Sequence, residues 1–327
     1  GPSVFAVLYR NCPFIVIATK GICLMTPEEW WKNFALGMEL DVAGAFIFNG
    51  VKRLDEVENF YYPTDIFEIF YNLSVGVERL LKVAIILVEH HEQTDMEALE
   101  KSLITHNVTE LTNRLGDARD LGFSSVHKEL LSILSKFYKT YRYGRFSFGS
   151  VPEIEREQEA FLQYISKHLQ IEIPAKDSFI PVFNNDQIRR FVGKVVKKIS
   201  DTAFFIIKNR ASELNIYTCE LRGESKAIRV FYGNRLDFID ERIKKKEILL
   251  FLMNCKESEA HLNLIRSFEP LELDPGMTPD YIKALINDSH LHLVGDEVDE
   301  LYTEVENAGE RIQMVDIIDN GHLSYDE

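Results

Sequence analysis

The 327-residue sequence lacks several features that would assign it to a familiar class. No apolar run reaches the roughly 20 residues that a membrane-spanning helix needs. The four cysteines are far apart, which argues against a zinc site with closely paired ligands and favours unpaired thiols in a reducing, cytoplasmic compartment. Glycine-rich phosphate loops, dinucleotide-binding motifs, G-x-S-x-G and H-E-x-x-H are absent. We therefore expect no membrane segment, no metal and no cofactor.

Basic residues are also in deficit, with 37 Lys and Arg against 52 Asp and Glu and a net charge of −15. An overall basic surface for nucleic acid is excluded, although a local basic patch is not. The charge is unevenly spread, because residues 287–327 hold 12 acidic residues and a single base, Arg311. Such an acidic tail could shield a basic patch on the same chain or engage a basic protein partner.

The pattern of apolar residues predicts a mainly α protein. Apolar residues recur at helical spacing from Thr26-Pro27 to about 57, from 64 to about 89, from 107 to 115, from 125 to 142 and from 153 to 169. These segments predict an N-terminal helical bundle over residues 3–170. Residues 171–184 contain two prolines and no helical period, and are interpreted as a connector.

The remainder, residues 185–327, is predicted to be a smaller α+β region with the acidic tail. A basic helix is expected over 185–209, and another over about 236–254. Between them, NIYTCELR and KAIRVFY are rich in β-branched and aromatic residues and are joined by Gly-Glu-Ser, which predicts a β-hairpin.

Three short stretches within the predicted bundle form a recognisable combination. A long helix contains VERLLK (77–82), a helix start contains THNV (105–108), and a later helix ends in YKTYRYGRF (138–146). In order and spacing these stretches resemble the HEPN (higher eukaryote and prokaryote nucleotide-binding) domain family, whose members often show an E-R/K-x-L-K helix, a T-H-D/N helix start and an R-Y end. The resemblance covers about residues 27–150.

This resemblance implies a helical bundle that usually forms a homodimer. It also implies an action on RNA, as in the ribonucleases of bacterial toxin–antitoxin, anti-phage defence and CRISPR systems. Many active members carry an Arg, four to six further residues and then a His. No arginine of this sequence has a His at that spacing, and Arg119 and His127 come nearest, with seven residues between them.

Under the resemblance, the candidate catalytic residues of a metal-independent endoribonuclease are His106, Arg79 and Arg142. His106 would move the proton, since its ordinary pKa of about 6.5 suits proton transfer near neutral pH, and the arginines would hold the phosphate. Candidate contacts to RNA or a nucleotide are Asn107, Lys82, Tyr143, Arg145 and Lys139. Basic and aromatic side chains alternate along the last of the three stretches, a combination that suits phosphates and stacked bases.

Structural interpretations of the same residues stay open. Asn107 and Glu110 have the spacing of a helix-capping box, with His106 packed against a neighbouring helix, and Glu78 with Lys82 is an ordinary intrahelical ion pair. The basic helix over 185–209 presents either a solvated face or a phosphate-binding surface. The alternative functions are a non-catalytic HEPN-like module that binds a nucleotide, an RNA or a protein partner, and a scaffold that acts through its acidic tail.

Overall fold

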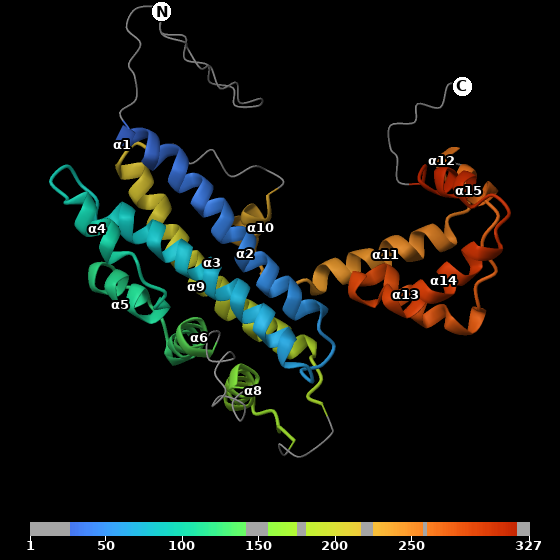
Figure 1. Cartoon of the computed structure of the whole chain (residues 1–327), viewed down its shortest axis with the longest axis horizontal. Coiled ribbons are helices and arrows are strands. Elements are labelled where there is room, and N and C mark those ends of the chain that lie inside the picture. The colour runs from blue at the N-terminus through green and yellow to red at the C-terminus, as the bar shows by residue number, and fades with distance from the viewer. Residues whose placement is uncertain (1–26, 142–155, 175–180, 217–224, 258–259, 319–327) are drawn as a thin grey trace, which may run out of the picture. The chain divides into compact units, whose positions relative to one another are not determined.

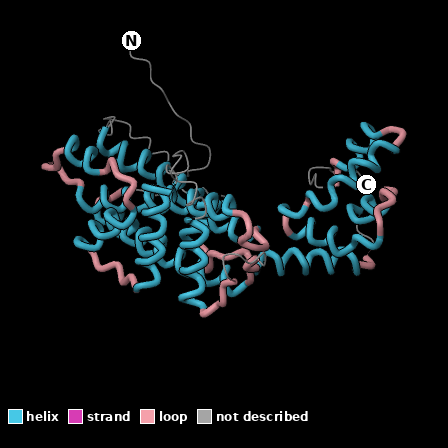
Figure 2. The backbone as a smooth tube through the Cα atoms, turned by 60° about the horizontal axis from the view of Figure 1, so that its bottom comes forward, coloured by secondary structure: helices cyan, strands magenta, loops and turns pink. Residues whose placement is uncertain are grey.

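The computed structural model describes residues 27–141, 156–174, 181–216, 225–257 and 260–318, and throughout these ranges the protein is all-α (Figures 1 and 2). The prediction of a mainly α protein is confirmed. Internal contacts divide the chain into two units, residues 1–237 and residues 238–327. The sequence placed this division between residues 170 and 185.

Three long helices lie side by side at the centre of the first unit: α2 (Leu36–Glu56), α3 (Pro63–Glu89) and α9 (Asp186–Glu213) (Figure 1). Shorter helices pack around them, namely α4 (Met96–Ser102), α5 (Val108–Ala118), α6 (Ser125–Lys136), α8 (Arg156–Leu169) and α10 (Lys226–Tyr232). A short helix, α1 (Pro27–Trp30), and a π-helical turn, η1 (Trp31–Ala35), lead into α2. A second π-helical turn, η2 (Phe137–Tyr141), extends α6.

Helix α3 forms the core of this unit because it is apolar on most of its circumference. Its first residue is Pro63, which needs no hydrogen-bond partner for its nitrogen at this position. The apolar residues that recur at helical spacing in this segment form one stripe and are all buried: Ile66, Ile69, Phe70, Leu73, Val77, Leu80, Leu81 and Ile85. Phe70 is fully buried and meets the rings of Phe137 and Phe161 edge to face, at centroid distances of 5.6 and 5.9 Å. These contacts join α3 to η2 and α8.

Small residues bring α2 close to its neighbours. A Cβ atom at Gly76 of α3 would lie 2.8 Å from the backbone nitrogen of Ile47 in α2, so the two helices touch backbone to backbone there. At Gly44 of α2, a Cβ atom would clash with the Cβ and Cα of Ala227 in α10. Glycine at these two positions therefore fixes the distance between the helices.

The predicted β-hairpin is wrong. Its second arm, Lys226–Tyr232, is helix α10, while most of its first arm lies outside the described residues. Ser225 caps this helix by accepting a hydrogen bond from the Ile228 backbone N–H at 3.3 Å. The buried residues Ala227, Val230 and Phe231 have helical spacing and face the bundle. Packing against α2 and α9 thus overrides the strand preference of the β-branched and aromatic residues.

The connector before α9 returns the chain to the turn between α2 and α3. Phe183 forms an isolated antiparallel bridge with Asn59. The buried Asn184 donates its side-chain amide to the carbonyls of Leu54 at 2.6 Å and Val57 at 2.8 Å. These bonds satisfy carbonyls at the end of α2 and place α9 alongside the bundle.

The second unit consists of short helices: α11 (Ile239–Asn254), α12 (Ala260–Ser267), α13 (Thr278–Ile286), α14 (His292–Glu304) and α15 (Ala308–Val315), with 3₁₀ turns η4 (Pro275–Met277) and η5 (Asp288–His290). The acidic tail is therefore helical over α14 and α15. Within the described residues this region contains no strand, so the predicted α+β character is not found.

One helical stretch of the described residues, Glu28–Glu56, is long and apolar enough to cross a membrane. A buried core helix of a soluble protein meets the same criteria of length and composition. In this structure α2 packs along α3 and contributes Leu40, Ile47 and Leu54 to the core.

Candidate functional site

Asn107 begins α5 and links it to α6. Its side-chain oxygen accepts hydrogen bonds from the Glu110 backbone N–H at 3.3 Å and from the Ser135 hydroxyl at 2.6 Å. Its own N–H donates to the Thr105 hydroxyl at 3.1 Å, rather than to Glu110. The N-cap that the sequence predicted is present, and the Asn107 oxygen is committed to holding two helices together.

Helix α5 is held firmly against α3. Val108, Leu111 and Leu115 are buried, and the Arg114 guanidinium forms an ion pair with both carboxylate oxygens of Glu89, at 2.7 and 2.5 Å. This charged hydrogen bonding raises the pKa of Arg114 above its ordinary value. The start of α5 therefore has a defined position relative to α3.

This packing places His106 beside Glu78 of α3. The Nδ1 atom of His106 lies 3.1 Å from Oε2 of Glu78, while Lys82 donates to the other oxygen, Oε1, at 2.6 Å. Glu78 is only 7% exposed. A buried carboxylate is costly unless its oxygens are paired, and here each oxygen has its own charged or hydrogen-bonding partner. The predicted Glu78–Lys82 pair is confirmed.

The imidazole of His106 is fixed on one side and open on the other. Its ring centroid lies 4.8 Å from that of Tyr138 in η2, and its side chain is 53% exposed. Among the described residues, no hydrogen bond is made to Nε2. When Nδ1–H of the neutral ring donates to Glu78, Nε2 is left as an acceptor. A carboxylate that orients a histidine in this way is a recurrent device of general acid–base catalysis.

Arg79 does not join this arrangement. Its guanidinium forms an ion pair with Glu39 of α2. Adjacent helical positions point about 100° apart, so Glu78 turns to α5 while Arg79 turns to α2. The structure therefore brings His106 and Lys82 together through Glu78 and leaves Arg79 engaged elsewhere.

The remaining predicted residues lie at and beyond the end of η2. Lys139 is described and exposed, next to Tyr138 in the chain. Arg142, Tyr143 and Arg145 lie outside the described residues. His106 contacts η2 at Tyr138. Among the predicted cations, Lys139 is therefore an exposed one that lies next to this contact in the chain.

Two members of this site, Glu78 and Tyr138, were absent from the predicted site residues. The available signal was a single carboxylate in a segment, Val77–Leu81, whose other residues apart from Arg79 are apolar, so that an unpaired charge there is costly. Spacing within one helix reveals Lys82 as a partner of Glu78, but His106 is 28 residues away. Only the packing of α5 on α3 supplies that partner.

Among the described residues, no group of three or more His, Cys, Asp or Glu side chains could hold a metal ion. Cys255 is a free thiol, and the other three cysteines lie outside the described residues. No family model, curated protein or solved structure matches this chain.

Proposed function

We propose that the first unit is a HEPN-like helical bundle that acts on RNA as a metal-independent endoribonuclease, in a bacterial stress or anti-phage response. The observation that carries the proposal is the contact between buried Glu78 and Nδ1 of the half-exposed His106, which leaves Nε2 without a hydrogen bond among the described residues. The order of the three sequence stretches supports the family resemblance. The partners implied are RNA and a second copy of the chain.

In the proposed reaction, Nε2 of His106 takes the proton from a ribose 2′-hydroxyl. The 2′-oxygen attacks the adjacent phosphorus, the bond from phosphorus to the 5′-oxygen breaks, and the proton is returned to that departing oxygen. The products are a 2′,3′-cyclic phosphate and a 5′-hydroxyl. Glu78 acts as a positioning residue, since its contact with Nδ1 orients the ring. Lys139, Arg142 and Arg145 would hold the phosphate.

The test is cleavage of a 5′-labelled single-stranded RNA by micromolar protein in the presence of EDTA. Loss of the histidine in His106→Ala should lower the rate by about 10²- to 10⁴-fold, because a positioned proton-transfer group contributes that much. Glu78→Gln should lower kcat more than it raises KM. The matched control is His91→Ala, which removes an exposed histidine just after α3.

A substrate with a 2′-deoxy sugar at the cut site should resist cleavage. The proposal fails when RNA stays intact in the wild-type reaction, or when His106→Ala, shown by circular dichroism to be folded, cleaves as fast as the wild type.

A second candidate is a non-catalytic HEPN-like module that binds RNA, a nucleotide or a protein partner. The ion pair between Arg79 and Glu39 favours it, because this arginine is not available to stabilise a developing phosphate charge. In this case His106→Ala would cost stability but leave RNA binding unchanged. The double charge reversal Arg142→Glu with Arg145→Glu would weaken binding, and unchanged binding would remove this candidate.

A further inference from the structure

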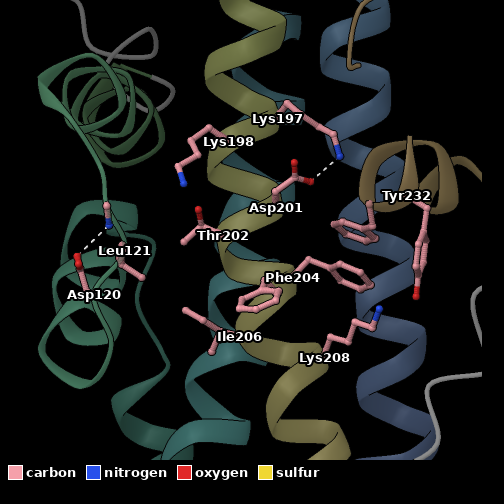
Figure 3. Close-up of a pocket in the computed structure, with 13 residues that line it drawn as sticks. Asp120, Leu121, Lys197, Lys198, Asp201, Thr202, Phe204, Ile206, Lys208 and Tyr232 are labelled. Atoms are coloured by element: carbon pink, nitrogen blue, oxygen red, sulfur yellow. Dashed lines mark hydrogen bonds and ion pairs between the residues drawn. The ribbon is translucent and has the colours of Figure 1, made fainter. Parts of the chain in front are cut away.

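A groove crosses the first unit on a different set of elements from those around His106. It is shallow and open to solvent, has a volume of about 580 Å³ and is lined by α9, by the loop after α5 and by the end of α10 (Figure 3). Asp120 and Leu121 stand on the loop side, and Tyr232 stands on the opposite side (Figure 3). Helix α5 therefore has His106 before its first residue and this groove beyond its last.

Aromatic rings form a rigid wall of the groove. The buried ring of Phe204 stacks on Phe231, with centroids 4.6 Å apart and planes 9° apart, and Tyr232 meets Phe204 edge to face at 5.3 Å. The outer rings stay accessible, because Tyr232 is 52% exposed and Phe205 is 63% exposed. Exposed rings on a fixed support provide surfaces on which planar groups can stack at a small entropic cost.

Two lysines of the groove are available to an anion. Lys197 is already occupied, because it donates to Asp201 at 2.5 Å and to the Val230 carbonyl at 2.9 Å. Lys198 and Lys208, in contrast, are exposed, and among the described residues neither forms an ion pair. Lys198 lies on the side of the α5–α6 loop and Lys208 on the side of Tyr232 (Figure 3). The Nζ atom of Lys208 lies 5.9 Å from the Tyr232 ring centroid.

We propose that this groove binds an unpaired stretch of RNA. Bases would stack on Phe205 and Tyr232, and phosphates would pair with Lys198 and Lys208. Exposed cations together with exposed rings are the combination that suits single strands, whereas the bases of a duplex are stacked on one another and do not present their faces. The inference rests on the proposed function, because it takes RNA as the substrate. It adds that the RNA must be single-stranded at the groove as well as at the cleavage site near His106.

Binding is measured with the full-length chain carrying His106→Ala, so that the RNA is not cut. The probe is a fluorescein-labelled RNA of about ten nucleotides without secondary structure, followed by fluorescence anisotropy. Phe205→Ala and Tyr232→Ala should each weaken binding about 5- to 100-fold, the usual effect of removing a stacking ring. Tyr232→Ala removes a contact with Phe204 and can disturb α10. Phe205→Ala avoids this problem, because Phe205 is largely exposed and its removal leaves the core intact.

The control for the ring is Phe183→Ala, because Phe183 is 66% exposed and lies outside the groove. Lys198→Glu should weaken binding and reduce the salt dependence, by about 0.7 in the slope of log affinity against log salt for each phosphate that the lysine neutralises. Lys246→Glu on α11 makes the same change in net charge and serves as its control. Equal binding by the groove variants and their controls would overturn the proposal.

A substitution at Asp120 should strengthen RNA binding, whereas the preceding substitutions should weaken it. Its carboxylate accepts a hydrogen bond from the Gly122 backbone N–H at 3.0 Å and stands at the groove, where it repels phosphate. Asp120→Asn should therefore tighten RNA binding about two- to fivefold, since the amide keeps the turn and removes the charge. Unchanged or weaker binding by this variant would contradict the proposal that RNA phosphates lie near Asp120 in the groove.

Two further probes define the ligand. A duplex of the same sequence should bind at least about tenfold more weakly, and AMP at the concentration of the RNA should not displace it. Equal affinity for duplex, or displacement by AMP, overturns the single-strand assignment. Because cleavage is measured separately, a chain that binds RNA through this groove without cutting it refutes the nuclease proposal and leaves this inference standing.

Discussion

The two units use their apolar residues differently. The largest fully buried side chains, among them Tyr164, Phe60 and Phe70, all belong to the first unit. In the described part of the second unit, the buried apolar residues are few: Phe238, Ile239, Ala284, Ile286 and Val294. Several large ones of α11 are exposed, including Ile248, Phe251 and Met253. Because stabilisation grows with the apolar area removed from water, the first unit should be the more stable of the two.

The chain provides a direct way to separate the units in an experiment. Its two tryptophans are Trp30 and Trp31, and both precede α2. Tryptophan fluorescence therefore reports on the first unit, while far-UV circular dichroism reports on the helices of both. In urea, we expect part of the dichroism signal to be lost before the fluorescence changes, since separate units need not unfold in one step. If the fluorescence and dichroism transitions coincide, the two units do not differ in stability as expected.

The largest effect is expected for Phe70→Ala. This ring is fully buried against Phe137 and Phe161, so its removal leaves a cavity and should lower the free energy of unfolding of the first unit by about 3–5 kcal/mol. The matched change in the second unit, Val294→Ala, removes two methyl groups and should cost about 1–2 kcal/mol. Urea titrations followed by fluorescence and by dichroism give the two values. Equal losses would mean that both units have similar cores.

The next effect compares one substitution at two glycines. Gly44→Ala should destabilise the first unit by about 1–3 kcal/mol, because the new methyl group meets Ala227 and forces α10 away from α2. At Gly295 in α14 an added Cβ meets no atom within 4 Å, so Gly295→Ala should stabilise the second unit by about 0.5–1 kcal/mol. Thermal unfolding of both variants measures the two signs. A Gly44→Ala variant at least as stable as the wild type would argue against the close packing of α10 on α2.

A smaller effect is expected at two helix caps. Asn107→Ala removes the hydrogen bonds to Glu110 N–H and to Ser135, and should cost about 1–2 kcal/mol. Asn307 precedes α15 but makes no side-chain capping bond, so Asn307→Ala should change stability by less than about 0.5 kcal/mol. Urea unfolding followed by dichroism compares them. A destabilisation at Asn307 as large as that at Asn107 would contradict the described cap.

The smallest effect concerns pH. His90 is buried at the end of α3, with its ring edge-on to Trp31 at 5.6 Å, and desolvation lowers its pKa, with Lys32 adding to the effect. The unfolded chain then binds a proton more readily than the folded one. Stability should be complete above about pH 6.5 and fall as the pH drops below that value. Tryptophan fluorescence in urea at about pH 7.5 and about pH 5.5 measures this, and His90→Gln should reduce the difference between the two pH values. An identical pH dependence in that variant would exclude His90.

Long helices were predictable because their apolar spacing is continuous. The stripe from Ile66 to Ile85 predicts both α3 and its buried face, and the Asn107 cap follows from residue type and position. Lys226–Tyr232 was mispredicted because a seven-residue segment rich in β-branched and aromatic residues fits either a strand or a helix. Its burial against α2 decides in favour of the helix, and such long-range packing has no local signal.

The candidate site was predictable only in part. His106 was selected by its chemistry and by resemblance, and Lys82 by resemblance, while the spacing of Lys82 from Glu78 predicted their ion pair. The engagement of Arg79 by Glu39, 40 residues away, depends on how α2 lies against α3. The same holds for the α9 groove, where Tyr232 meets Lys208 only because α10 is helical and docks on α9.

Helix α5 carries one proposed RNA contact at each end. Its 11 residues give it a length of about 16 Å. Glu89 of α3 holds this helix in place through Arg114. The distance between His106 and the groove therefore does not vary with the sequence of the RNA. On the proposed function, α5 fixes the distance between the groove and His106. A strand whose base is stacked in the groove would therefore be cut at a constant distance from that base. The number of nucleotides between the anchored base and the cut would then be the same for every RNA, whatever its sequence.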